Sequence, residues 1–136
     1  MAVVYVASSK GLGEWAADVG LTKHVYKIGV AENAATALTA LNEGRVAGEG
    51  DWKIIAKEKV EAADEEALIG RLAHKERMVD PALYPKIKGA RGIFKVKPAN
   101  VENHIIVKRA LAGEEDIAVK LKPADIGGYL IHNALH

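Results

Sequence analysis

The sequence predicts an α/β fold in which a small mixed β-sheet is flanked by about three helices. Short runs of β-branched residues alternate along the chain with longer segments whose apolar residues recur at helical spacing. The 136 residues are 49% hydrophobic and 27% charged, which is typical of one folded globular domain. We therefore expect the order strand, strand, helix, strand, helix, strand, helix, strand.

The first part of the chain predicts two strands and a helix. Residues 2–7, "AVVYVA", are rich in β-branched side chains and end at the turn sequence "SSKGLG", after which a loop is expected. A second apolar run at 24–30 predicts a strand that pairs with the first. A helix over about 33–43 follows, with Asn33 to cap its start and Gly44 to end it.

The middle of the chain predicts a strand, a helix and a further strand. Residues 51–60 form the apolar run of the strand, and Asp64 can cap a helix over 64–77. Residues 78–92 contain two prolines and two glycines and therefore indicate a loop. Apolar and basic residues alternate at 93–97, which is typical of a half-buried strand.

The last part of the chain predicts one more helix and one more strand. Residues 99–113 indicate a helix that ends at Gly113, and residues 117–122 alternate as a strand does. The final segment, "PADIGGYLIHNALH", fits either a strand or a frayed helix.

Charge and composition exclude several classes of protein. The formal net charge is +1, so only a local cluster of charges can indicate a polyanionic partner. The chain has no cysteine, which excludes disulfides, thiolate nucleophiles and cysteine metal sites and fits a reducing compartment. The apolar start lacks a basic leader, and no run is long enough to span a bilayer, so we expect a cytoplasmic protein that does not bind membranes.

The segments VYV (4–6) and YKIG (26–29), followed by a helix, resemble the signatures of the GIY-YIG nuclease superfamily. The resemblance is greatest to the phage-associated branch, in which the second signature reads KIG. Residues 51–75 resemble that branch's third strand and acidic-started helix, and residues 91–105 resemble its closing strand and helix.

The resemblance implies a GIY-YIG-like domain over 1–112. Residues 113–136 would then form a C-terminal extension, a strand plus a tail, packed on that domain or on a partner.

The resemblance also implies which positions would form a phosphodiester-cleaving site, with a base, a divalent metal and a cation near the phosphate. Tyr5 matches the family's first tyrosine and Lys27 matches the second signature. Ala37 stands where the family has its helix arginine, and Ile69 stands at the metal-binding glutamate, so that Glu66 is available only through a shift in register. Because members of a catalytic constellation act as a unit, the resemblance implies a scaffold that has lost this cleavage.

A basic segment from residue 81 to residue 101 contains no acidic residue. Its cations are Lys86, Lys88, Arg91, Lys95 and Lys97. Together with Lys27 they are the predicted contacts to a nucleic-acid backbone, DNA more than RNA. The alternative interpretations are a solvated surface that balances the acidic stretch 58–66 and, for Tyr5, a packing role in the core.

Three hypotheses about function follow. The first is a nucleic-acid-binding domain with a degenerate nuclease-like fold and no cofactor. The second is an active endonuclease that uses magnesium or manganese at Glu66, with Arg45 or Lys23 as the cation. The third is an assembly protein, or homo-oligomer, that docks through the apolar side chains of residues 113–136. Those side chains are Tyr129, Leu130, Ile131 and Leu135.

Other chemistry-bearing residues do not form a recognisable pattern. His132 and His136 are four residues apart and would share a helical face, but no third ligand has suitable spacing, so they do not indicate a metal site. His104 is expected to face solvent. Ser8 and Ser9 have no histidine partner that would indicate hydrolase chemistry.

Overall fold

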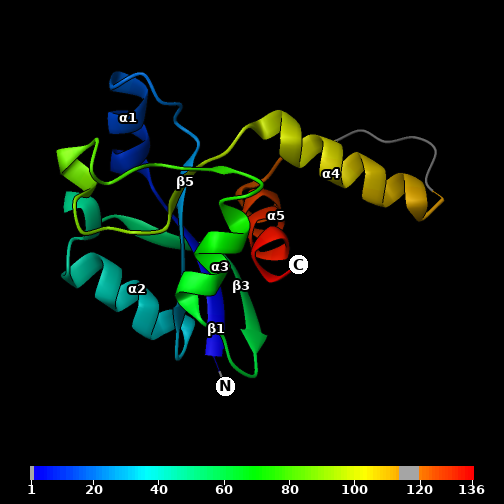
Figure 1. Ribbon diagram of the computed structural model, residues 1–136, viewed down its shortest axis with the longest axis horizontal. Helices are drawn as coiled ribbons and strands as arrows, with labels where there is room; N and C mark the ends of the chain where they lie inside the picture. Colours follow the sequence, from blue (N-terminus) through cyan, green and yellow to red (C-terminus); the bar gives the residue numbers. More distant parts are fainter. Residues whose placement is uncertain (1, 114–119) are drawn as a thin grey trace.

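The computed structural model describes residues 2–113 and 120–136, which form one antiparallel sheet with helices packed on both faces (Figure 1). The strands are β1 (Ala2–Ser9), β2 (Val25–Ala31), β3 (Trp52–Val60), β4 (Arg77–Met78) and β5 (Ile93–Lys95), in the order β3-β1-β2-β5-β4. The predicted α/β class is therefore confirmed.

The prediction of a mixed sheet is wrong, because every neighbouring pair of described strands is antiparallel. Strands β2 and β3 run in the same direction and are joined by a helix, as a parallel pair would be. However, β1 lies between them and pairs with both, so no parallel pair forms.

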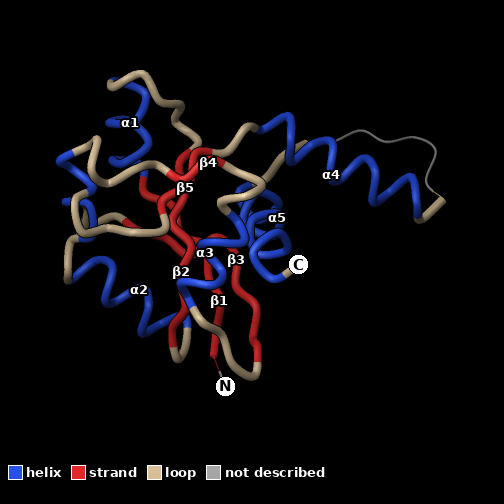
Figure 2. Tube along the Cα trace, viewed as in Figure 1, coloured by secondary structure: helices blue, strands red, loops and turns tan. Residues whose placement is uncertain are grey.

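Five α-helices, rather than about three, occur in the described ranges. They are α1 (Lys10–Asp18), α2 (Ala34–Glu43), α3 (Glu65–Leu72), α4 (Pro98–Leu111) and α5 (Pro123–Leu135), and two short 3₁₀ turns are η1 (Val46–Gly48) and η2 (Pro85–Ile87). Figure 2 separates these helices from the strands and the connecting loops.

Helix α1 occupies the segment that the sequence predicted as a loop. Ser9 caps it, since the Ser9 hydroxyl accepts a hydrogen bond from the Leu12 amide at 3.1 Å. Leu12 and Ala16 lie on one face of the helix and are fully buried. The two glycines of "SSKGLG" suggested a turn, but burial of these apolar side chains outweighs the weak helix propensity of glycine.

The caps of α2 and α3 confirm the predicted helix starts. The Asn33 side chain accepts from the Thr36 amide at 2.7 Å, and the Asp64 carboxylate accepts from the Glu66 amide at 3.2 Å. Helix α3 ends at Leu72 rather than at residue 77, because the chain there turns into β4.

A hydrophobic core lies on each face of the sheet. Val4 and Val6 of β1 face α3 and α5, whereas Tyr5 and Ala7 face α1 and α2. This alternation follows from the two-residue period of a strand.

The C-terminal segment, which the sequence left open between a strand and a helix, forms helix α5. This helix packs in the core that contains Val4 and Val6. Its side chains Leu130, Ile131 and Ala134 are buried there. Gly127 allows the close approach to β3, since a Cβ at that position would lie 2.5 Å from the Cβ of Ala56. Half of the strand predicted at 117–122, residues 117–119, lies outside the described residues, and residues 120–122 are not in a strand.

Helix α4 projects away from the sheet (Figure 1). Val101, near its start, is buried, whereas Val107 and Leu111 are 57% and 85% exposed. No helix within the described parts of the chain is both long and apolar enough to cross a membrane.

Candidate nucleic-acid interface

The VYV and KIG segments lie side by side, as predicted for the first two strands. Tyr5 pairs with Gly29 and Ala7 pairs with Lys27 across β1 and β2. A Cβ at Gly29 would lie 2.5 Å from the Tyr5 hydroxyl oxygen and 2.9 Å from Oε1 of Glu65. The absence of a side chain at Gly29 therefore brings the phenol of Tyr5 and the carboxylate of Glu65 together, and we call this group of Tyr5, Lys27 and Glu65 the Tyr5 corner.

Tyr5 is 6% exposed and packs in the core that faces α1 and α2. Burial, and secondarily the negative charge of Glu65, raises the pKa of the Tyr5 hydroxyl to about 12. The phenol therefore keeps its proton at neutral pH. A base with this pKa is poorly matched to activating water near pH 7.

The ammonium group of Lys27 links β2 to the loop that precedes β5. Its Nζ donates to the Arg91 carbonyl oxygen at 2.9 Å and to that of Ile28 at 3.4 Å. Burial lowers the pKa of Lys27, and the charge of Glu65 partly offsets this effect. The Lys27 side chain thus satisfies backbone carbonyls beside β2.

The carboxylates near the Tyr5 corner also have partners. Oε1 of Glu65 accepts from the Val30 amide at 3.0 Å, at a part of β2 that β5 does not cover. Oε2 of Glu66 accepts from Nε of Arg91 at 2.9 Å, with both side chains half-exposed. Glu65, rather than Glu66, is therefore the carboxylate that approaches Tyr5, one residue away from the predicted position.

The positions that the resemblance assigns to an arginine and a glutamate lie in the core. Ala37 of α2 is 4% exposed and Ile69 of α3 is 1% exposed. Of the proposed replacement cations, Arg45 folds back so that Nη2 donates to the Gly48 carbonyl at 3.2 Å, and Lys23 lines a separate cavity together with Tyr26 and residues of α1.

The basic residues predicted between residues 81 and 101 fall into three groups. Lys86 pairs with Glu49 at 2.8 Å between Nζ and Oε1, and Arg91 pairs with Glu66. Lys88 is exposed on the loop before β5. Lys95 and Lys97 line a cavity of about 300 Å³ with two further cations, Lys75 and Arg77.

This cavity, which we call the basic cavity, is built around the pairing of β4 with β5. Arg77 lies directly opposite Lys95 in the antiparallel pair. Like charges in such cross-strand positions repel unless an anion is present. Within residues 2–113 and 120–136, no hydrogen bond or ion pair engages the side chain of Arg77, Lys95 or Lys97.

One carboxylate, Glu76, also lines the basic cavity and is 6% exposed. It accepts hydrogen bonds from Nδ2 of Asn100 at 3.1 Å and from the Tyr129 hydroxyl at 2.5 Å. Burial and the Glu76 carboxylate raise the pKa of Tyr129, so this hydroxyl stays protonated and donates. The charge of Glu76 is thus directed into the protein, which leaves four cations around a single, already bonded acid.

Sequence reasoning missed Lys75 and Arg77 because Glu76 stands between them and the acid-free segment begins only at residue 81. The sequence around them, "HKER", shows three basic side chains at the end of a predicted helix. Only the pairing of β4 with β5 brings two of these cations beside Lys95.

A histidine cluster lies close to the basic cavity. His104 of α4 does not simply face solvent as expected, since its ring packs edge-on against Tyr129 at 5.4 Å and lies 5.0 Å from the ring of His132. His132 and His136 share a face of α5, with centroids 4.8 Å apart. No group of three acidic, histidine or cysteine side chains in the described ranges is arranged to hold a metal ion.

Comparison with known proteins adds no relative, since no family model, no curated protein and no solved structure matches the chain.

Proposed function

We propose that this chain binds nucleic acid through the basic cavity and does not cleave it by the GIY-YIG mechanism. The observation that carries the proposal is a cavity lined by four cations, Lys75, Arg77, Lys95 and Lys97, whose one carboxylate among the described residues is already hydrogen-bonded. Lysine and arginine neutralise backbone phosphates, and this contact supplies most of non-specific affinity.

The placement of the cations supports a polyanion rather than a single small anion. They come from the turn between α3 and β4, from β4, from β5 and from the residue that precedes α4. Cations spread over several elements can contact successive phosphates of one strand. As the sequence suggests, DNA is the proposed partner ahead of RNA.

The loss of cleavage is supported by the state of the Tyr5 corner. The Tyr5 phenol retains its proton, the Lys27 ammonium is bonded to backbone carbonyls, and Ala37 and Ile69 are core residues. None of these groups offers a positive charge to a phosphate at this place.

The direct test is the anisotropy of a fluorescein-labelled DNA oligonucleotide, titrated with the protein at several salt concentrations. Replacing Lys97 by alanine should weaken binding and should lower the slope of log K against log salt by about 0.9, because one phosphate contact is lost. Lys88→Ala is the matched control, since Lys88 is an exposed lysine of the same acid-free segment that does not line the cavity.

Two results would contradict this proposal. The first is a wild-type protein that binds neither DNA nor RNA at low salt. The second is an equal loss of affinity in Lys97→Ala and Lys88→Ala, which would mean that the basic cavity has no special part.

One observation favours the alternative of an active endonuclease, namely the approach of Glu65 to Tyr5. A carboxylate together with substrate phosphates is a common donor set for Mg²⁺, so Glu65 is the residue that would hold Mg²⁺ or Mn²⁺ here. A plasmid-nicking assay with either metal, comparing Glu65→Gln with Glu66→Gln, tests this alternative. Nicking that is lost only in Glu65→Gln would support it over the binding-only proposal.

A further inference from the structure

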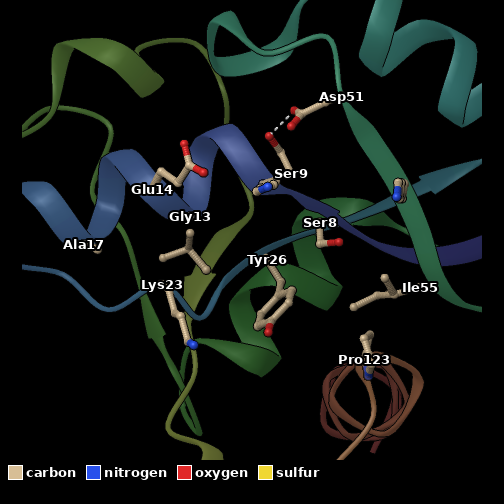
Figure 3. A pocket seen from close by; sticks show the side chains of 13 residues that line it. Ser8, Ser9, Gly13, Glu14, Ala17, Lys23, Tyr26, Asp51, Ile55 and Pro123 are labelled. Carbon is tan, nitrogen blue, oxygen red and sulfur yellow. Dashed lines mark hydrogen bonds between the residues drawn. The ribbon is translucent and has the colours of Figure 1, made fainter.

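A second and larger cavity, of about 810 Å³, opens between α1, the start of α5 and the strands β1, β2 and β3 (Figure 3). We call it the α1 cavity. Its size lies within the range of small-molecule sites in proteins. The ring of Tyr26 faces this space, and the apolar side chains of Ile55 and Pro123 also line it. The proposed function does not use this cavity.

Tyr26 is held as a fixed aromatic wall. Its hydroxyl lies 3.2 Å from Nδ1 of His24, which is two residues earlier in the chain. Burial raises the pKa of Tyr26, while burial and the charge of Lys23 lower the pKa of His24. Both rings are therefore neutral at pH 7, and their hydrogen bond fixes the orientation of the phenol.

The charged groups around the α1 cavity favour an anion. Three lysines, Lys10, Lys23 and Lys53, line it together with two carboxylates, Glu14 and Asp51. Asp51 is already bonded, since it accepts from the Ser9 hydroxyl and, at 3.0 Å, from the Gly11 amide. The bond from Ser9 in particular lowers the pKa of Asp51. Within the described residues, no hydrogen bond or ion pair engages the side chains of the three lysines, so they are available to an anionic group at the rim; the Glu14 carboxylate is likewise unpaired.

The α1 cavity and the basic cavity are neighbours at one end of the sheet. Val25 lines the α1 cavity and pairs directly with Lys95, which lines the basic cavity. Next to this pair, the amide of Val96 donates to the His24 carbonyl at 2.9 Å. The two cavities therefore have lining residues on the paired strands β2 and β5.

We propose that the α1 cavity takes one unpaired nucleotide, with its base against Tyr26 and its phosphate at Lys23 and Lys53. The inference rests on the proposed function, because the rest of the strand would run over the basic cavity. A base can enter such a cavity only after leaving its stack, and single-stranded nucleic acid offers such bases without the cost of unpairing. The protein should therefore prefer single strands over duplexes.

The first test fills the α1 cavity. Ala17 is an exposed residue of α1 that lines the cavity, so Ala17→Phe places a ring inside it, and Ala17→Ser is the small control. With fluorescein-labelled single-stranded and duplex oligonucleotides of one sequence, we expect Ala17→Phe to weaken single-strand binding about tenfold. Duplex binding should not change, and Ala17→Ser should behave as the wild type.

A second pair of variants tests the predicted phosphate contact on a different element, β3. Lys53→Ala should weaken single-strand binding and reduce its salt slope by about 0.7. Lys59→Ala is the matched control, an exposed lysine of the same strand that lines neither cavity. Circular dichroism of each variant shows whether it folds.

Adenosine monophosphate, titrated by calorimetry, distinguishes a free nucleotide from a strand as the source of the ligand. If the mononucleotide binds and Ala17→Phe abolishes that binding, the cavity takes free nucleotides. If single strands are preferred over duplexes and lose this preference in Ala17→Phe, the cavity takes a nucleotide of a strand.

The inference is overturned if Ala17→Phe and Lys53→Ala leave both single-strand and mononucleotide binding unchanged. It is also overturned if they weaken single-strand and duplex binding equally. In either case the loss of affinity in Lys97→Ala would still stand, so the failure of this inference is distinct from failure of the proposed function.

Discussion

The Tyr5 corner and the basic cavity use their charged residues in different ways. In and around the Tyr5 corner each ionised group has a nearby partner: Lys27 binds carbonyls, Glu65 binds an amide and Glu66 binds Arg91. In the basic cavity, Arg77 and Lys95 oppose each other across a strand pair. The charged side chains at the Tyr5 corner thus bind other parts of the chain, whereas those of Arg77, Lys95 and Lys97 have no partner within the described residues and are available to an anion.

The largest effect is expected from a substitution that disturbs the packing of the Tyr5 corner. Gly29→Ala would place a Cβ 2.5 Å from the Tyr5 hydroxyl, and such overpacking costs about 1–3 kcal/mol. Chemical denaturation should show this loss, while the affinity of the folded variant for DNA stays the same. Gly70→Ala is the control, because its Cβ would meet open space and should stabilise α3 by roughly 0.5–1 kcal/mol.

A reduced affinity of folded Gly29→Ala for DNA would contradict the packing role of the Tyr5 corner, because the corner would then take part in binding.

The second prediction compares two double variants that each remove two positive charges, one from unpaired cations and one from cations in ion pairs. The double change Lys95→Gln with Lys97→Gln should weaken DNA binding about tenfold or more and lower the salt slope by nearly 2, because two phosphate contacts are lost. The double change Lys86→Gln with Arg91→Gln removes cations that already bind Glu49 and Glu66. Anisotropy titrations should show a much smaller loss there, and equal losses would contradict the division into free and paired charges.

A smaller effect is expected from Ser9, which both caps α1 and binds Asp51 beside the α1 cavity. Ser9→Ala should cost about 1 kcal/mol of stability, the usual price of a lost N-cap. Because the folded pKa of Asp51 is lowered, its contribution is present above the ordinary aspartate pKa and is lost as pH falls through the folded value. In Ser9→Ala the carboxyl should titrate closer to an ordinary aspartate, as measured by NMR, and an unchanged titration would contradict the assigned cause.

The smallest effect concerns the histidine cluster next to the basic cavity. Burial, followed by the charges of His104, His136, Lys75 and Lys108, lowers the pKa of His132. The unfolded chain therefore binds more protons just below the ordinary histidine pKa of about 6.5, so stability should fall as the pH drops through that value. His132→Gln should flatten this dependence in thermal melts, and an unchanged slope would show that another group is responsible.

The local elements could be predicted because their causes lie within a few residues. The apolar runs at 2–7, 24–30 and 51–60 became β1, β2 and β3 with small changes of boundary, and Asn33 and Asp64 cap helices as expected. Period and capping are properties of neighbouring side chains, so they are visible in a sequence.

The site was only partly predictable. Lys95 and Lys97 were identified from an acid-free segment and do line the basic cavity, but Lys75 and Arg77 were not identified. Glu65 was missed by one residue because the resemblance pointed to Ile69 or Glu66. The predicted contacts of Lys27, Lys86 and Arg91 to nucleic acid stay predictions, and the structure gives each of these residues a partner within the chain.

Patterns along the chain were enough to predict an α/β domain and the pairing of its first two strands. That α1 is a helix, that all described strand pairs are antiparallel and that α5 joins the core became clear only from the folded arrangement. The folded arrangement also decided which cations stay free. Ion pairs such as Lys86 with Glu49, and strand pairs such as Arg77 opposite Lys95, join residues far apart in the chain, whereas local patterns depend on neighbours.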